Sequence, residues 1–169
     1  MKDNTVLTPH FELREFTESA TAKKHGIDNR PTPEVVENLR RLCTHTLEPL
    51  REKLGLPIII TSGYRTKELN DIIVHASRKS QHMSGQAADF WVSGFKFQDS
   101  GQASHRELLI KAFRLIITDE SIDFDQLILY PNFIHVSYVS QERNRHQITK
   151  ANGNGMYCAL SRADALALR

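Results

Sequence analysis

Two apolar segments joined by a very short connection constrain the fold of this chain most strongly. The segments span residues 125–130 and 133–139, and Pro131-Asn132 lies between them. Because so short a connection fits a hairpin turn, the two segments are predicted to pair as antiparallel strands. The chain is therefore expected to build a sheet, and its other segments must cover part of that sheet.

A long helix is predicted upstream of this hairpin. Thr32 is a suitable cap residue, Pro33 fits the first helical position, and Glu34 suits the positive end of a helix. Apolar residues then recur at helical spacing to about Leu47 or beyond. Pro49 is expected to kink or end this helix, because proline has no backbone N–H to donate.

Further helices and a strand are predicted in the rest of the chain. A second long helix is predicted over residues 104–118, where Ser104 and Glu107 have the spacing of a capping box. Residues 57–61 form a β-branched run that is typical of a buried strand, and a short helix is expected over residues 66–76. The predicted fold class is α+β, with a small, largely antiparallel sheet packed with helices.

Size and charge exclude several classes of protein. A chain of 169 residues with 40% apolar content can build one core, so a single domain over residues 1–169 is expected. The 22 basic and 20 acidic residues give a net charge of +2, and the basic residues are scattered along the chain. No nucleic-acid partner is expected, because phosphate binding requires a concentrated positive face. A monomer is expected.

The distribution of apolar residues also bears on location. No stretch approaches the roughly 20 consecutive apolar residues of a membrane span, and the first residues lack the apolar core of a secretory signal. We expect a protein made in soluble form in the cytoplasm.

Cys43 lies in an apolar helical pattern, which favours a buried, reduced thiol over a disulfide.

His82 and Asp89 are seven residues apart, with glycine and small residues between them. In a continuous helix the two side chains would lie about 10 Å apart, and in a continuous strand they would point to opposite faces. If they act together, a turn must separate them, and Ser84-Gly85 is where it can form. Residues 87–92 can then run as a strand. By itself, this stretch could also be an exposed polar loop.

His135 lies in the middle of an apolar strand, on the face opposite Ile134 and Val136. A buried histidine usually satisfies its ring nitrogens with a core hydrogen bond. Together with His82 and Asp89, however, His135 completes a set of two histidines and one carboxylate. Three protein ligands, with a fourth position left to water, are typical of a catalytic zinc site.

The motif SxHxxGxAxD, at residues 80–89, and the HVS sequence at residues 135–137 resemble the zinc D-alanyl-D-alanine carboxypeptidases and L-alanyl-D-glutamate endopeptidases. Hedgehog signalling domains share the fold of these enzymes. The SGYR sequence at residues 62–65 is similar to another segment of the family, and the resemblance covers residues 11–147. It implies a hedgehog/DD-peptidase-like fold.

Two further motifs resemble a subgroup that is common in phages and prophages. They are the FDQLI sequence at residues 124–128 and Asn144-Arg145. The implied function is hydrolysis of peptide bonds in the peptidoglycan stem peptide, by a carboxypeptidase or an endopeptidase, in cell-wall lysis or remodelling. Action on the wall would then follow phage-assisted release from the cytoplasm.

The resemblance also implies roles for individual residues. His82, Asp89 and His135 match the ligands of a Zn²⁺ ion. Arg65 matches an arginine that contacts the substrate near the reacting carbonyl, where its guanidinium would stabilise the developing oxyanion. Ser80 matches a substrate-binding serine.

The general base departs from the family pattern. Asn132 occupies the position of the usual carboxylate, and an amide cannot accept a proton at neutral pH. Asp125 is the nearest upstream acid and the predicted base, Asp123 is the next, and Tyr130 is a further alternative. His75, just before the zinc segment, could line the cleft.

This departure leaves two other functions open. One is a zinc-containing peptidoglycan-binding domain without catalytic activity. The other is a soluble D,D-dipeptidase that cleaves free dipeptides but leaves the intact wall uncut.

Overall fold

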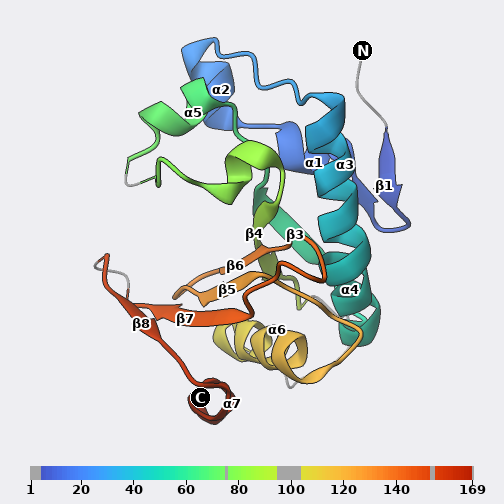
Figure 1. Cartoon of the computed structure of the whole chain (residues 1–169), viewed down its shortest axis with the longest axis vertical. Coiled ribbons are helices and arrows are strands. Elements are labelled where there is room, and N and C mark those ends of the chain that lie inside the picture. Colours follow the sequence, from blue (N-terminus) through green and yellow to red (C-terminus); the bar gives the residue numbers. More distant parts are fainter. Residues whose placement is uncertain (1–4, 75, 95–103, 153–154, 169) are drawn as a thin grey trace.

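A six-stranded mixed sheet lies at the centre of the structure, a computed structural model that describes residues 5–74, 76–94, 104–152 and 155–168 (Figure 1). The strand order is β3-β4-β6-β5-β7-β8, and every neighbouring pair is antiparallel except β5 and β7. The strands are β3 (Ile58–Ser62), β4 (Ala87–Val92), β5 (Gln126–Leu129), β6 (Ile134–Ser137), β7 (Gln147–Ala151) and β8 (Tyr157–Ala159). The predicted α+β fold with a largely antiparallel sheet is confirmed.

The predicted hairpin is the pair β5 and β6. Leu129 pairs with Ile134 at its closed end, and residues 130–133 form the turn. The turn is longer than Pro131-Asn132 because Tyr130 and Phe133 belong to it: the Tyr130 N–H donates to the Phe133 carbonyl at 3.0 Å.

Helices pack against the sheet, and a separate two-stranded hairpin, β1 (Val6–Thr8) and β2 (Phe11–Glu12), lies near the N-terminus. The α-helices are α1 (Leu13–Thr17), α2 (Ala20–His25), α3 (Pro33–Leu42), α4 (Glu48–Leu54), α5 (Lys67–Ile72), α6 (His105–Thr118) and α7 (Arg162–Ala167). Thr32 caps α3 through its side chain, and Ser104 and Glu107 form the predicted capping box of α6. The helix expected over residues 66–76 ends earlier, at Ile72, because Ile73 adopts an extended backbone.

The first long helix continues past Pro49. A π-helical turn, η1 (Cys43–Leu47), joins α3 to α4. Proline has no N–H to offer the His45 carbonyl one turn earlier, and that carbonyl accepts instead from the Asp123 N–H at 3.0 Å. The Thr46 hydroxyl donates to the Asp123 carbonyl at 2.5 Å. Pro49 therefore does not end the helix; it frees a carbonyl that holds the segment leading into β5.

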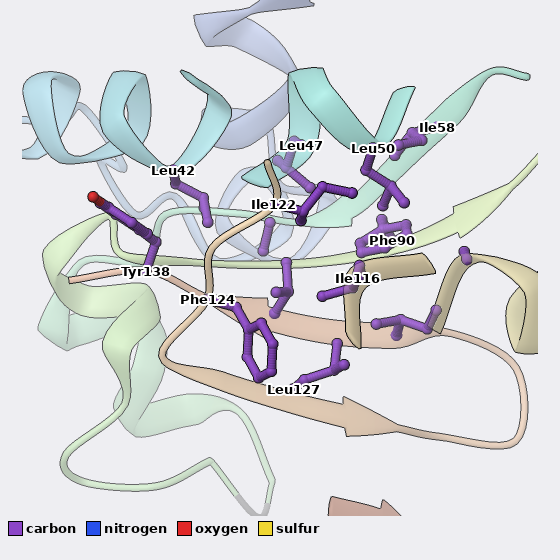
Figure 2. Close-up of a cluster of buried hydrophobic side chains, with 14 of the residues drawn as sticks. Leu42, Leu47, Leu50, Ile58, Phe90, Ile116, Ile122, Phe124, Leu127 and Tyr138 are labelled. Carbon is purple, nitrogen blue, oxygen red and sulfur yellow. The ribbon is translucent and has the colours of Figure 1, made fainter. Parts of the chain in front are cut away.

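The hydrophobic core lies between one face of the sheet and the long helices. Figure 2 shows side chains from α3, η1 and α4 meeting those of β3, β4, β5 and α6. Leu42, Leu47 and Leu50 are fully buried, as are Phe90 and Leu127 of the sheet. Each such side chain contributes about 1.5–3 kcal/mol of burial free energy.

Cys43 is also fully buried and has a free thiol, as predicted. None of the helices in the described part of the chain combines the length and the apolar content needed to cross a membrane.

Candidate metal centre

The candidate site lies on a row of residues that runs across the sheet. Ser62 of β3 pairs with Asp89 of β4, Asp89 pairs with His135 of β6, and His135 pairs with Ile128 of β5. Directly opposed residues on neighbouring strands point to the same face of a sheet. Because Ala88 and Phe90 on either side of Asp89 are fully buried in the core, Asp89 and His135 lie on the opposite face.

His82 joins this pair from outside the sheet. Its Nε2 atom lies 3.3 Å from Asp89 Oδ1, and His135 Nδ1 lies 2.7 Å from the same oxygen. One ligand atom from each of the three residues can be chosen so that all lie within 4.8 Å of one another. The structure thus brings together the three residues that the sequence singled out as metal ligands.

A tight turn carries the chain from His82 into β4. His82 lies in a short 3-10 helix, η2 (Gln81–Ser84), and Gly85 follows with a left-handed φ of 69°. A Cβ atom on Gly85 would lie 2.7 Å from the Val35 carbonyl oxygen of α3. The turn predicted at Ser84-Gly85 is therefore present, and both its backbone conformation and its packing favour glycine.

The imidazole of His82 is held in one orientation by a backbone carbonyl. His82 Nδ1 lies 2.7 Å from the Gly63 oxygen, and a carbonyl can only accept, so Nδ1 carries the proton. When the ring is neutral, Nε2 then presents a lone pair towards the Asp89 carboxylate. Two acceptors that face each other at 3.3 Å are stabilised by a cation between them. This arrangement fits a metal site, in which the second ring nitrogen is typically held by a carbonyl or carboxylate.

The position of that carbonyl depends on a close contact with α1. The Gly63 backbone packs on Phe16 so tightly that a Cβ atom on Gly63 would lie 2.5 Å from the Phe16 Cα and carbonyl oxygen. The next residue, Tyr64, donates its N–H to the Phe16 carbonyl at 2.7 Å. Glycine is therefore the residue that allows this segment to approach α1 and orient His82.

The protonation states of His82 and Asp89 suit a metal ion. Burial lowers the pKa of His82, which keeps its imidazole neutral at neutral pH. Burial by itself would raise the pKa of Asp89, but the neighbouring His82 and His135 outweigh it and hold this pKa well below its ordinary value. Neutral imidazole and ionised carboxylate are the forms that bind zinc.

A cavity of about 1000 Å³ opens over this cluster. Arg65 and Ser80 line it together with His82, Asp89 and His135. Arg65 is largely buried: its Nε atom donates to the Ser62 hydroxyl at 3.2 Å, and its Nη2 atom lies 3.5 Å from Asp89 Oδ2. Burial lowers the pKa of Arg65, but a guanidinium stays cationic at neutral pH.

Ser80 immediately precedes η2. Its side chain makes no capping hydrogen bond to that helix, although its backbone carbonyl accepts from the Met83 N–H at 3.1 Å. The hydroxyl therefore lines the cavity without serving as a helix cap.

The candidates for a general base lie in different surroundings. Asp125 lines the cavity, but Arg145 binds both of its oxygens, at 2.8 Å through Nε and at 2.5 Å through Nη2. Burial raises the pKa of Asp125, but the hydrogen bonds from Arg145 and Gln81 outweigh this and lower it to about 2. Such a carboxylate is a poor proton acceptor at neutral pH, so its contacts oppose the predicted role. Asp125 as the general base stays a prediction.

The remaining candidates do not supply an obvious base. Burial and the Tyr157 hydroxyl raise the pKa of Tyr130 well above its ordinary value, so at neutral pH it can donate a proton but not accept one. Asp123 accepts from Asn144 and His146, at 2.9 and 2.8 Å, and borders a different cavity. Asn132 is not among the described residues that line the cavity over the metal cluster. His75 lies outside the described residues.

Three contributions to the site were not predicted. The Gly63 carbonyl orients His82, while the side chains of Gln81 and Arg145 bind Asp125. In the sequence, Asn144-Arg145 shows only a resemblance to a subgroup, and Gln81 occupies a variable position of its motif. The spacing of charged residues did not predict the ion pair between Asp125 and Arg145, which lie 20 residues apart.

The fold and the site together define a class of protein: an α+β domain in which three side chains that could hold a metal ion line an open cavity. The model of the Peptidase M15 family matches residues 9–125, more than half of the chain, so the chain belongs to this family. The family indicates a metallopeptidase, and the α+β architecture agrees with a hedgehog/DD-peptidase-like fold. No curated protein matches the chain. His135 lies beyond the matched residues, and the pairing of β6 with β4 brings it to the site.

Proposed function

We propose that this chain is a zinc peptidase that hydrolyses peptide bonds in the stem peptide of bacterial peptidoglycan. The observation that carries the proposal is the cluster of His82, Asp89 and His135 at the wall of a large open cavity. In this proposal the three side chains hold one Zn²⁺ ion. When bound, zinc supplies Lewis acidity, which activates water and polarises the scissile carbonyl.

Arg65 and Ser80 are proposed to bind the substrate. The Arg65 guanidinium is held by Ser62 and lies beside Asp89, so its donors are ordered before the substrate arrives. A fixed donor of this kind stabilises the negative charge that develops on the carbonyl oxygen. The Ser80 hydroxyl, free of capping, can position the peptide backbone.

The charge of the cavity supports an acidic peptide as substrate. Within the described part of the chain, four cationic side chains line it: Arg65, Lys79, Arg143 and Arg145. The carboxylates among its described lining residues are Asp89, which belongs to the metal cluster, and Asp125, which is paired with Arg145. Stem peptides carry free carboxylates, and a cleft of opposite sign raises the local concentration of such a substrate.

We also propose that the protein belongs to the phage or prophage type and reaches the wall after phage-assisted release. The support is local: the two motifs of that subgroup meet in space, where Asp125 of the first pairs with Arg145 of the second. Cleavage of intact wall material, and not only of free peptides, is expected for such a protein.

A second candidate function is a zinc-containing domain that binds peptidoglycan without cleaving it. Two residues favour this function, because neither supplies a free carboxylate as general base. Asn132 replaces the usual carboxylate, and Asp125 is bound in an ion pair. A domain of this kind would retain the metal cluster and the cationic cavity.

One experiment separates these functions. Purified protein is analysed for zinc and incubated with intact peptidoglycan, isolated stem peptides and free D,D-dipeptide, and the products are identified by mass spectrometry. Loss of a C-terminal residue would identify a carboxypeptidase, and a cut within the stem would identify an endopeptidase. Bound zinc without products would favour the binding domain, and cleavage of the dipeptide alone would favour a D,D-dipeptidase. His82→Ala protein serves as the metal-free control.

A further inference from the structure

Asp125 is the buried centre of a hydrogen-bond network that connects three segments of the chain. Asp125 is 1% exposed. Its carboxylate accepts hydrogen bonds from the Nε and Nη2 atoms of Arg145, and from the Arg145 backbone N–H at 2.9 Å. Gln81 donates to Asp125 Oδ2 through Nε2 at 2.9 Å. The Ser137 hydroxyl contacts the same oxygen at 3.4 Å. The carboxylate thus has donors from η2, β6 and the segment before β7.

Two of these donors belong to the segments that carry the metal ligands. Gln81 directly precedes His82 in η2, and Ser137 follows His135 by two residues on the same face of β6. Arg145 closes the network, because its Nη2 atom also donates to Gln81 Oε1 at 3.4 Å. Both polar ends of the Gln81 side chain are therefore engaged. The first residue of η2 is therefore anchored through its side chain, and the next residue, His82, is anchored through its ring by the Gly63 carbonyl.

Removal of either Asp125 or Arg145 would release the Gln81 side chain from one of its two contacts. A buried carboxylate without its donors is costly, and a glutamine without its acceptor is free to rotate. By contrast, the nearby Asp123 binds Asn144 and His146 but is not among the partners of Gln81 or His82. The same stretch of chain thus contains one hydrogen-bonded carboxylate that is connected to the metal cluster, Asp125, and one that is not, Asp123.

We propose that Asp125 and Arg145 form a positioning pair that holds Gln81, and through it His82, in the geometry required to bind the metal ion. This inference rests on the proposed zinc site, and it gives Asp125 a role other than that of the general base. It also assigns a physical function to the two motifs at residues 124–128 and 144–145: each supplies one half of the pair.

Metal affinity measured without turnover tests the proposal. Zinc dissociation constants are obtained by chelator competition for the wild type, Asp125→Asn, Arg145→Gln and Gln81→Leu. The visible absorption of the Co²⁺-substituted proteins reports the ligand geometry. Each variant is expected to bind zinc about 10-fold or more weakly, as is typical when the support of a metal ligand is lost. The cobalt spectrum is expected to change in the same variants.

Asp123→Asn is the matched control, because it changes a hydrogen-bonded carboxylate of the same segment that has no contact with Gln81. The thermal unfolding of every metal-free protein is recorded alongside. Gln81→Leu keeps the ion pair of Asp125 and Arg145, so it tests the connection even where the other two variants fail to fold. An effect of equal size in Asp123→Asn would overturn the proposal, because general loosening would then explain the result.

The remaining outcomes separate this inference from the proposed function. Zinc affinity and cobalt spectra that are unchanged in Gln81→Leu and Asp125→Asn would overturn the positioning role while leaving the zinc site intact. If Asp125→Asn also lost activity with full zinc affinity, Asp125 would act in catalysis itself. A wild-type protein that binds no zinc would overturn the proposed function and this inference with it.

Discussion

Asp89 of β4 and His135 of β6 are direct partners across two antiparallel strands, and Asp89 Oδ1 lies 2.7 Å from His135 Nδ1. The register of the sheet therefore sets the distance between two of the three candidate ligands. A shift of this register by one residue would turn one of the two side chains towards the core. His82 completes the cluster from a 3-10 helix, so the site depends on both the sheet and the turn at Gly85.

Replacement of His82, Asp89 or His135 by alanine is expected to abolish tight zinc binding. Each side chain supplies one of three protein ligands, and two ligands bind zinc far more weakly than three. Elemental analysis after gel filtration should give about one zinc per chain for the wild type and almost none for the variants. His25→Ala, at the exposed end of α2, is the control and should retain the metal. Full retention in His135→Ala would remove that residue from the site.

Arg65→Ala is expected to retain zinc but to lower turnover by about 10² to 10³, the usual effect of losing one donor to a developing oxyanion. Arg65→Lys keeps the charge but loses the forked geometry, so an intermediate loss is expected. Turnover is measured on wall fragments, with the exposed Arg30→Ala as the control. Unchanged turnover in Arg65→Ala would show that the guanidinium has no part in the reaction.

Gly63→Ala is expected to destabilise the fold by about 2–3 kcal/mol, because the added Cβ atom meets the Phe16 backbone at 2.5 Å. The same displacement should move the carbonyl that orients His82 and so weaken zinc binding. Gly55→Ala is the control: it places alanine at a φ of 61° with no atom within 4 Å, which costs about 1 kcal/mol. Urea unfolding and zinc affinity are measured for both. Equal zinc affinity in the two variants would contradict the role of the Gly63 carbonyl.

The ion pair of Asp125 and Arg145 should make stability depend on pH. The pKa of Asp125 is about 2 in the folded chain and 3.8 for an unperturbed aspartate, so folding favours its charged form. This contribution is fully present above about pH 4 and is lost as the pH falls through about 2. We expect about 1–2 kcal/mol, reduced by the partial exposure of Arg145. Urea unfolding of the wild type and Asp125→Asn between pH 2 and 7 should show a difference that shrinks towards low pH. A difference independent of pH would contradict the ion-pair origin.

The local features of the site could be predicted from the sequence. The cap of α3 at Thr32, the capping box of Ser104 and Glu107, and the turn at Gly85 depend on neighbouring residues, and all three are present. The alternation around His135 likewise placed Ile134 and Val136 on one face of the strand, and the structure buries both side chains. These predictions succeeded because the backbone period and the turn chemistry are set within a few residues.

Contacts between distant segments could not be predicted in this way. The parallel pairing of β5 with β7 brings Gln147 opposite Gln126, and so places Arg145 on Asp125. The long helix passes Pro49 because the Asp123 N–H, far along the chain, uses the carbonyl that proline leaves free. No local sequence pattern predicts either contact, because each forms only when particular strands and helices become neighbours.

The sequence by itself determined the types of ligand, their order and the turn between the first two, because these follow from side-chain chemistry and local backbone preference. Only the tertiary structure decided that His135 lies beside Asp89, that the Gly63 carbonyl orients His82, and that Asp125 is bound by Arg145 and Gln81. The physical reason is that hydrogen bonds and strand pairs between residues tens of positions apart form only when the whole core packs.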